Sequence, residues 1–285
     1  MNLEDLKALA AKLPGDYKKN ATALIARMEE VVEGIGDEPQ RWKAPNLKLV
    51  QGTTDRSSIP KGTAIGDFIL GETKVEQPFP FIPIRFWDGR QMWSPDQNES
   101  KLLCSSPDAK LGYIGAYCNA CPHAKFDEVA RKSECGKTKN ILAIRSDLSD
   151  IFMAGFAKTN YKTGLELESA AKKAGVAPYK RVYALVSETN KQYKNVENYA
   201  VELLPDDKKN TPDTLTDFLK ELFAIVNEDR KQNVEKFYEA VLAKKQSAAL
   251  LDAPAESNTV LLTDDTPAAE AGESTVSELA KNYTV

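Results

Sequence analysis

Residues 81–93 read FIPIRFWDGRQMW, an apolar and aromatic run followed by a polar turn and a second tryptophan. The first seven residues, 81–87, have the composition of a β-strand, with Pro80 before them and Asp88-Gly89 after them as turn signals. Pro83 lies inside this strand and favours an edge or a bulge, because proline cannot donate a ladder hydrogen bond. The stretch predicts a strand that ends among basic and aromatic side chains.

Further strands are predicted on either side of this one, each bounded by turn residues: 65–70, 140–145, 181–187 and 198–204. Residues 149–174 have helical apolar spacing and end in two lysines and a glycine, which predicts a helix between the third and fourth strands. Asp147 and Asp150 stand where the N-cap of this helix is expected. Five strands with a helix in this position have the chain order of an OB-fold, a partly open barrel. We therefore expect a protein that is mainly β with α, with an OB-fold-like five-stranded barrel over residues 63–204.

Helices are expected on both sides of the barrel. Residues 1–36 carry aliphatic side chains at three- and four-residue steps and predict an N-terminal helical arm, broken at Pro14-Gly15. Residues 36–62 are rich in turn-forming residues and predict a linker. Residues 212–250 repeat the helical spacing and predict a C-terminal helix.

The formal net charge of −4 is unevenly distributed. Residues 246–285 contain seven acidic side chains and one basic one, which leaves the rest of the chain at +2. We expect residues 252–285 to be a disordered acidic tail. Such a tail could recruit replication or transcription proteins, or compete with nucleic acid for a basic surface on the body.

All the cysteines of the chain lie in one 32-residue window, at Cys104, Cys118, Cys121 and Cys135. Two thiolates in a Cys-x2-Cys pair can bind one Zn²⁺ together, and two flanking thiolates can complete the tetrahedron. Residues 101–139 are therefore predicted to form a module around one structural zinc ion. Buried free thiols or a disulfide pair are the alternative. The single histidine, His123, is expected to be a solvated loop residue.

Basic and aromatic side chains alternate along the predicted barrel. Single-stranded nucleic acid is held by a positive groove and by rings on which bases stack, each stack contributing about 1–3 kcal/mol. The candidate contacts are Arg85, Trp87, Arg90, Trp93, Tyr113, Tyr117, Lys158, Tyr161, Lys162, Lys180, Arg181 and Tyr183. Either tryptophan could instead cap the barrel. Four further aromatic residues are expected in the core: Phe79, Phe81, Phe152 and Phe156.

Several functional classes lack their sequence signals. The chain has no phosphate-binding GxxxxGK[ST] loop and no GxGxxG, and one histidine leaves little scope for histidine-based catalysis. We therefore expect no enzyme. The N-terminus lacks a signal-peptide pattern and no stretch is apolar enough to span a membrane, so a cytoplasmic protein without membrane association is expected.

The residues together resemble a known family. A GDFILG segment at 66–71, the FIPIRFWDGR segment at 81–90, the Cys…Cys-x2-Cys-Pro…Cys module and a final β-hairpin are similar to zinc-containing single-stranded-DNA-binding proteins of tailed bacteriophages. The plan resembles the T4-type helix-destabilising proteins, which ligate zinc with three Cys and one His, whereas here four thiolates would do so. The resemblance implies coating of exposed strands during phage DNA replication, recombination and repair in the host cytoplasm, with possible self-association along the DNA.

Two other functional classes remain open from the residues. One is a zinc-containing transcription accessory factor that acts on RNA polymerase through its helices or tail. The other is an enzyme such as a nuclease, although no residue pattern nominates a reaction.

Overall fold

The computed structural model describes residues 3–29, 44–94, 101–129, 133–194, 196–202, 204–206 and 208–251. The expected acidic tail, 252–285, lies outside the described residues. The chain divides into two compact units. The first, Met1–Asp88 with Lys137–Arg230, is called the main unit here. The second, Gly89–Gly136 with Lys231–Val285, contains every cysteine and is called the cysteine unit.

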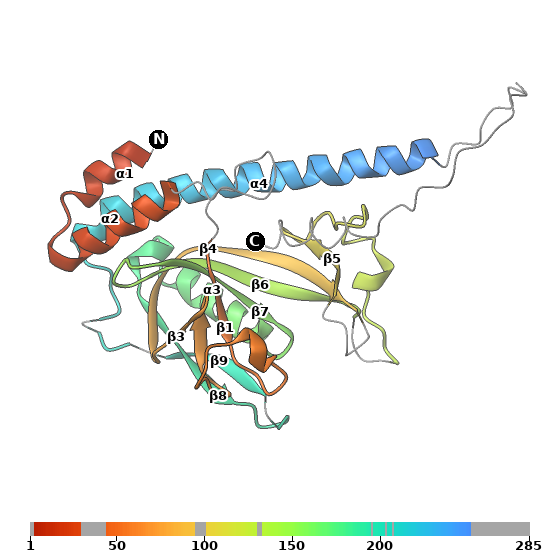
Figure 1. Ribbon diagram of the computed structural model, residues 1–285, viewed down its shortest axis with the longest axis horizontal. Helices are drawn as coiled ribbons and strands as arrows, with labels where there is room; N and C mark the ends of the chain where they lie inside the picture. The colour runs from red at the N-terminus through yellow and green to blue at the C-terminus, as the bar shows by residue number, and fades with distance from the viewer. Residues whose placement is uncertain are drawn as a thin grey trace, which may run out of the picture. The chain divides into compact units, whose positions relative to one another are not determined.

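The described part of the chain is a mixed α/β structure with a nine-stranded sheet and four α-helices (Figure 1). The helices are α1 (Leu3–Ala10), α2 (Gly15–Glu29), α3 (Tyr161–Lys173) and α4 (Thr216–Leu251). The strands are β1 (Asn46–Leu49), β2 (Phe68–Leu70), β3 (Thr73–Val75), β4 (Phe79–Trp93), β5 (Leu102–Ser106), β6 (Cys135–Arg145), β7 (Ile151–Ala157), β8 (Tyr183–Thr189) and β9 (Glu197–Glu202).

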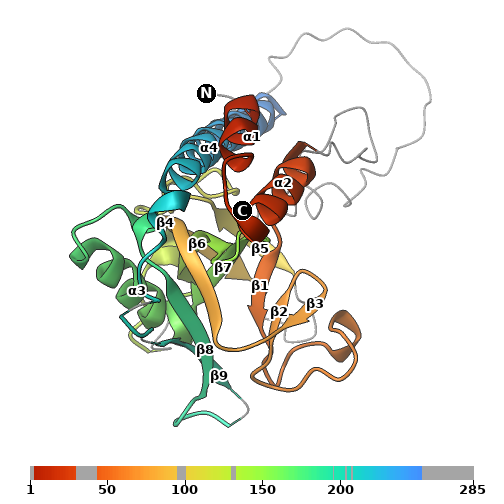
Figure 2. The ribbon, with the colours of Figure 1, turned by 90° about the vertical axis from the view of Figure 1, so that its left-hand side faces the viewer.

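The sheet is open and curled. Its strand order is β3-β2-β1-β7-β6-β4-β8-β9, and β5 pairs with β4 beside this path. The β1–β7 pair is parallel, whereas β1–β2, β2–β3, β6–β7, β4–β5, β4–β8 and β8–β9 are antiparallel. Figure 2 shows how the β1–β2–β3 end curls toward the β8–β9 hairpin. The result is a half-barrel.

Side chains join β1 to β9 across the curl of the sheet. The Tyr199 hydroxyl on β9 donates to the Leu47 carbonyl on β1 at 3.1 Å. The Gln51 amide donates to the Glu197 carbonyl at 2.9 Å and accepts from the Glu197 N–H at 2.8 Å. One side-chain amide thus replaces a pair of ladder hydrogen bonds, which satisfies the backbone where β1 and β9 meet.

The concave side of the half-barrel encloses an aromatic core. Phe152 packs edge-on against Phe79 and Phe81, with ring centroids 5.1 and 5.9 Å apart, and Phe156 packs on Tyr199 at 5.1 Å. Edge-to-face contacts of this kind add to the free energy gained by burial alone. The expectation that Phe79, Phe81, Phe152 and Phe156 lie in the core is confirmed, since each is at most 1% exposed.

A second core joins the N-terminal helices to the strands of the main unit. Leu6 of α1 and Leu24 of α2 are completely buried, and they belong to one cluster with Ile82 of β4, Ile144 of β6 and Leu219 of α4. The clustered face of each helix follows from its apolar spacing, because residues three and four apart lie on one side. The predicted N-terminal helical arm is therefore a hairpin, α1–α2, packed against strands and α4.

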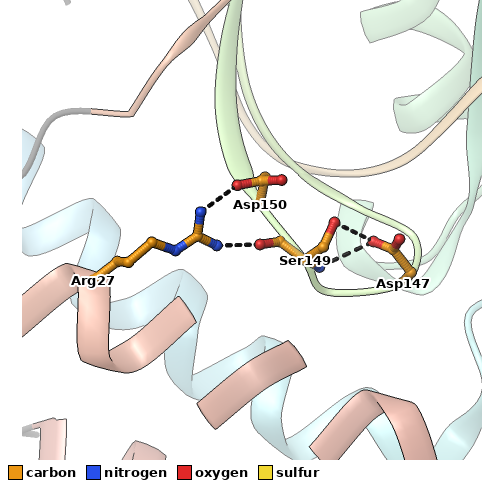
Figure 3. A network of polar contacts seen from close by, with 4 residues as sticks. All are labelled: Arg27, Asp147, Ser149 and Asp150. Atoms are coloured by element: carbon orange, nitrogen blue, oxygen red, sulfur yellow. Dashed lines mark hydrogen bonds and ion pairs between the residues drawn. The ribbon is translucent and has the colours of Figure 1, made fainter. Parts of the chain in front are cut away.

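Polar contacts fix α2 to the turn between β6 and β7 (Figure 3). Arg27 pairs with the Asp150 carboxylate at 2.6 Å and also donates to the Ser149 carbonyl. The Asp147 carboxylate accepts from the Ser149 N–H at 3.0 Å and from its hydroxyl at 2.7 Å. Asp147 therefore caps a β-turn and Asp150 binds an arginine, so the prediction that they cap a helix is wrong.

The predicted helix over 149–174 is wrong in its first half. Residues Ile151–Ala157 form β7, and α3 begins only at Tyr161. Nearly every side chain of β7 is buried because both faces of this strand are covered, so its sequence has no alternation to distinguish it from a buried helix. Similarly, β1 lies within the predicted linker, and its four residues are too few for a periodic signal.

The remaining predicted strands are real but differ in extent. The strand predicted at 81–87 is the central part of β4, which runs for 15 residues, and that at 140–145 is the end of an 11-residue β6 that begins at Cys135. The predicted C-terminal helix corresponds to α4, which is 36 residues long. No helix in the described ranges is long and apolar enough to cross a membrane.

A buried lysine holds α3 against the sheet. Lys139 of β6 is 3% exposed, and its ammonium lies 2.6 Å from Asp88 and 2.7 Å from Glu168 of α3. Burial lowers the pKa of Lys139, but the two carboxylates outweigh this effect and raise it. Burial likewise raises the pKa of Glu168, and hydrogen bonds from Lys139 and Lys172 outweigh it and lower that pKa.

Replacing Gly164 tests the close approach of α3 to β6. A Cβ there would lie 2.8 Å from both Cβ and Cγ of Lys139 and 2.9 Å from Cβ of Phe156. We expect Gly164→Ala to lower the free energy of unfolding by at least about 1 kcal/mol, although alanine favours a helix by about 1 kcal/mol. Urea denaturation measures the change. Ser169→Ala on the exposed face of α3 is the control and should be neutral or slightly stabilising; a stabilising Gly164→Ala would contradict the packing.

Replacing Glu168 tests the ion pairs. We expect Glu168→Gln to lower the free energy of unfolding by about 2 kcal/mol at pH 7. Because the folded-state pKa is below the ordinary value of 4.5, this contribution is present above pH 4.5 and is lost as the pH falls through the lowered pKa. Urea denaturation from pH 7 to 3 should therefore show the two proteins converging in stability. Glu166→Gln, at an exposed pair with Lys162, should differ from the original protein by less than about 0.5 kcal/mol throughout.

Candidate functional site

The cysteines come from three parts of the cysteine unit. Cys104 lies on β5, Cys118 and Cys121 lie in the loop between β5 and β6, and Cys135 is the first residue of β6. All are free thiols and are 6–8% exposed. A window of 32 residues thus contributes four sulfur atoms to the interior of a small unit.

Backbone hydrogen bonds fold the loop back onto β5. The Tyr113 N–H donates to the Ser105 carbonyl at 2.9 Å, and the Cys118 N–H donates to the Lys110 carbonyl at 2.7 Å. Gly115 has a φ of 80°, a conformation that glycine adopts without steric cost, and it makes the turn between these contacts. The loop therefore returns Cys118 to the neighbourhood of Cys104.

Gly112 shows how close these two sulfur atoms come. A Cβ at Gly112 would lie 3.0 Å from Sγ of Cys104 and 3.9 Å from Sγ of Cys118. Two sulfur atoms from residues fourteen positions apart therefore approach the same point of the backbone. Any larger residue than glycine at this position would displace Cys104.

Hydrogen-bond donors lie next to three of the sulfur atoms. Burial raises the pKa of Cys104, Cys118 and Cys135, because it disfavours the thiolate. The N–H groups of Ile114 and Tyr113 oppose this rise at Cys104. The Ser106 hydroxyl, which is buried without a well-formed hydrogen bond, opposes it at Cys118, and the Arg90 guanidinium does so at Cys135. The surroundings thus contain the donors that a thiolate needs.

The described residues contain no ready-made metal site. Across the described ranges, no three Cys, His, Asp or Glu side chains are grouped tightly enough to hold a metal ion. His123 is 43% exposed in its side chain and lies 2.5 Å from the Glu134 carboxylate through Nδ1. The four-thiolate zinc site therefore stays a prediction.

The second half of α4 completes the interior of the cysteine unit. Phe237 and Val241 are buried in one cluster with Cys104, Leu111 and Tyr113. At this end of the helix the Tyr238 hydroxyl donates to the Asp108 carboxylate at 2.5 Å, and burial together with this carboxylate raises the tyrosine pKa. A helix that begins more than eighty residues after the last cysteine therefore packs directly against the cysteine loop.

Several predicted nucleic-acid contacts in the main unit are engaged within the protein. Trp87 is 8% exposed, and the Arg230 guanidinium lies 4.1 Å from its ring centroid. Arg85 donates to the Asn227 side chain on α4. Tyr183 is partly buried, with its ring centroid 6.2 Å from that of Phe81. These side chains make contacts within the protein that hold β4, β8 and α4 together.

The other main-unit candidates lie near the surface in two groups. Lys158, Tyr161 and Lys162 stand at the start of α3, where the two lysines are exposed and the tyrosine is half-buried. Lys180 is exposed and Arg181 half-buried, and Arg181 forms an isolated β-bridge with Asn210. The residues within each group are close because they are neighbours in the sequence, and the fold does not bring the two groups to one another.

The candidates in the cysteine unit differ sharply in exposure. Trp93 and Tyr117 are 47% and 65% exposed. Tyr113 is 7% exposed, and the Lys244 ammonium lies 4.6 Å from its ring centroid, so it belongs to the interior. Arg90 donates to the Cys135 carbonyl at 3.3 Å. Phe126, which sequence reasoning missed, is 65% exposed beside Lys125, and this basic-aromatic pair was the available signal.

No family model, curated protein or solved structure matches this chain.

Proposed function

We propose that the protein binds single-stranded DNA without catalysing a reaction on it, and that the cysteine unit supplies the stacking surface. One observation carries the proposal. Within the described ranges, four large aromatic side chains are highly exposed, and three of them, Trp93, Tyr117 and Phe126, belong to the cysteine unit. The curled sheet with its aromatic core supports an OB-fold-like barrel as the fold of the main unit.

Proteins that bind single-stranded nucleic acid use aromatic rings on which bases stack. An exposed ring leaves apolar surface in contact with water, and a stacked base of any sequence covers that surface. Charge plays the smaller part in this unit, because residues 89–136 contain six basic and six acidic side chains. Stacking on the exposed rings is therefore proposed as the main source of affinity in the cysteine unit.

We also propose that Cys104, Cys118, Cys121 and Cys135 bind one structural Zn²⁺. Four buried free thiols with hydrogen-bond donors around them suit thiolate ligands better than apolar packing. The ion, when bound, would cross-link β5, the loop and β6. By the resemblance to phage proteins, the biological context would be DNA replication, recombination and repair, with the segment 252–285 recruiting partner proteins.

A second candidate function is supported by a different observation. Ile114 and Val129 are also exposed in the cysteine unit, at 49% and 96%, and aliphatic side chains do not stack on bases. They suit a protein partner, as in a zinc-containing transcription accessory factor acting on RNA polymerase. Removal of residues 252–285 distinguishes the two functions. A single-stranded-DNA-binding protein should keep or strengthen its oligonucleotide binding. A transcription accessory factor should lose its principal activity.

The stacking surface is tested by anisotropy titration of fluorescent oligo-dT. We expect binding that weakens as salt is raised, and Trp93→Ala, Tyr117→Ala and Phe126→Ala should each weaken it about 5- to 150-fold, the equivalent of 1–3 kcal/mol. Ile114→Ala is the matched control, because it removes exposed apolar area without an aromatic ring, and it should leave the affinity within about twofold. Absence of oligo-dT binding at low salt would overturn the proposal, and equal losses for all four variants would favour a protein interface.

The metal is tested by emission spectroscopy on the purified full chain. We expect about one equivalent of zinc, and less than about half an equivalent in Cys118→Ser, since three remaining ligands bind zinc more weakly. Removal of zinc by a chelator should lower the thermal unfolding temperature, because ligand binding to the folded state stabilises it. A chain purified with less than about half an equivalent of zinc, and unaffected by the chelator, would contradict the metal proposal while leaving the DNA proposal standing.

A further inference from the structure

Arg90 lies on the same face of the sheet as the cysteine cluster. The β4–β5 register places Arg90 opposite Ser106 and Met92 opposite Cys104. Residues two positions apart on a strand point to the same face, so Arg90 and Cys104 share one face of this pair of strands. The Arg90 side chain is half-buried there, and its Nη1 donates to the Cys135 carbonyl at 3.3 Å.

The Arg90 guanidinium also lies within hydrogen-bonding reach of the Cys135 sulfur. The Ser106 hydroxyl, on the residue opposite Arg90 in β5, lies beside the Cys118 sulfur. A guanidinium has five N–H donors in one plane, enough to serve the carbonyl and the sulfur of one residue together.

We infer that Arg90 is a positioning residue of the cysteine cluster, which orients Cys135 and offsets thiolate charge, and is not a phosphate contact. The inference rests on the proposed zinc site and deepens it. One Zn²⁺ with four thiolates carries a net charge of −2, and a buried net charge is costly unless an opposite charge is close. Arg90 is suited to offset this charge because it contacts Cys135, one of the proposed ligands.

The same contacts separate Arg90 from a phosphate-binding arginine. A phosphate contact presents its donors to solvent, where a strand can reach them. At least one donor of Arg90 is committed to the backbone of Cys135, and the side chain is partly withdrawn from solvent. Partners of this kind around metal ligands typically contribute 10- to 100-fold to metal affinity.

The test uses the full chain with Arg90→Gln, Arg90→Lys and a control, Lys125→Gln. The control removes one positive charge from an exposed position in the same unit. Zinc affinity is measured by competition with a chromophoric chelator. The thiolate charge-transfer band of the Co²⁺-substituted protein gives a spectroscopic readout of the ligand environment. Oligo-dT affinity is measured at saturating zinc.

We expect Arg90→Gln to lower zinc affinity about 10- to 100-fold and to shift the cobalt band. Arg90→Lys should restore part of the loss, because it keeps the charge but not the planar donors. The zinc affinity of Lys125→Gln should remain within about twofold of that of the original protein. At saturating zinc, the oligo-dT affinity of Arg90→Gln should likewise remain within about twofold of that of the original protein.

Unchanged zinc affinity and an unchanged cobalt band in Arg90→Gln would overturn the inference, as would a tenfold loss of oligo-dT binding at saturating zinc. If Arg90→Gln does not fold, Arg90→Lys carries the test, and unchanged zinc affinity in that variant overturns the inference. An original chain that binds no zinc overturns both this inference and the zinc proposal. Zinc binding that is insensitive to Arg90 overturns this inference alone.

Discussion

The cysteine unit has to bury four thiols with very little apolar material around them. In the described part of that unit, the buried cluster consists of Cys104, Leu111, Tyr113, Phe237 and Val241. A core of this size contributes too little burial to hold a long loop by itself, which is why small units usually need a metal ion or a covalent cross-link. The loop, β5, the start of β6 and the end of α4 all depend on how this requirement is met.

The main unit has enough apolar burial, and its constraint is the hydrogen bonding of an open sheet. Its sheet is curled but not closed by a continuous ladder, so β9, which within the described ranges pairs with β8 alone, needs other partners on its free side. Gln51 and Tyr199 supply them from side chains, while Lys139 ties α3 to β6. The aromatic core inside the curl supplies the apolar burial that the cysteine unit lacks. Buried rings therefore support the fold here, and exposed rings concentrate in the other unit.

This division changes the meaning of the basic-aromatic pattern. Trp87 and Trp93 lie six residues apart on β4 and have similar sequence surroundings, but Trp87 is buried beneath Arg230 and Trp93 is half-exposed. Arg85 and Arg90 both bond to groups of the protein, one to α4 and the other to Cys135. Composition marks the segment as basic and aromatic, but only the packing distinguishes the side chains that a ligand could reach from those that hold the strands.

The sequence by itself determined the apolar segments that became core, the two helical ends and the grouping of the cysteines, because these depend on residue type and on spacing along the chain. Only the tertiary structure decided that residues 151–157 are a strand and that α4 packs on Cys104. It also decided that Arg90 faces the thiols and Phe126 faces solvent. Burial of a side chain depends on elements far away in the chain, and a local pattern carries no information about which of them will cover it.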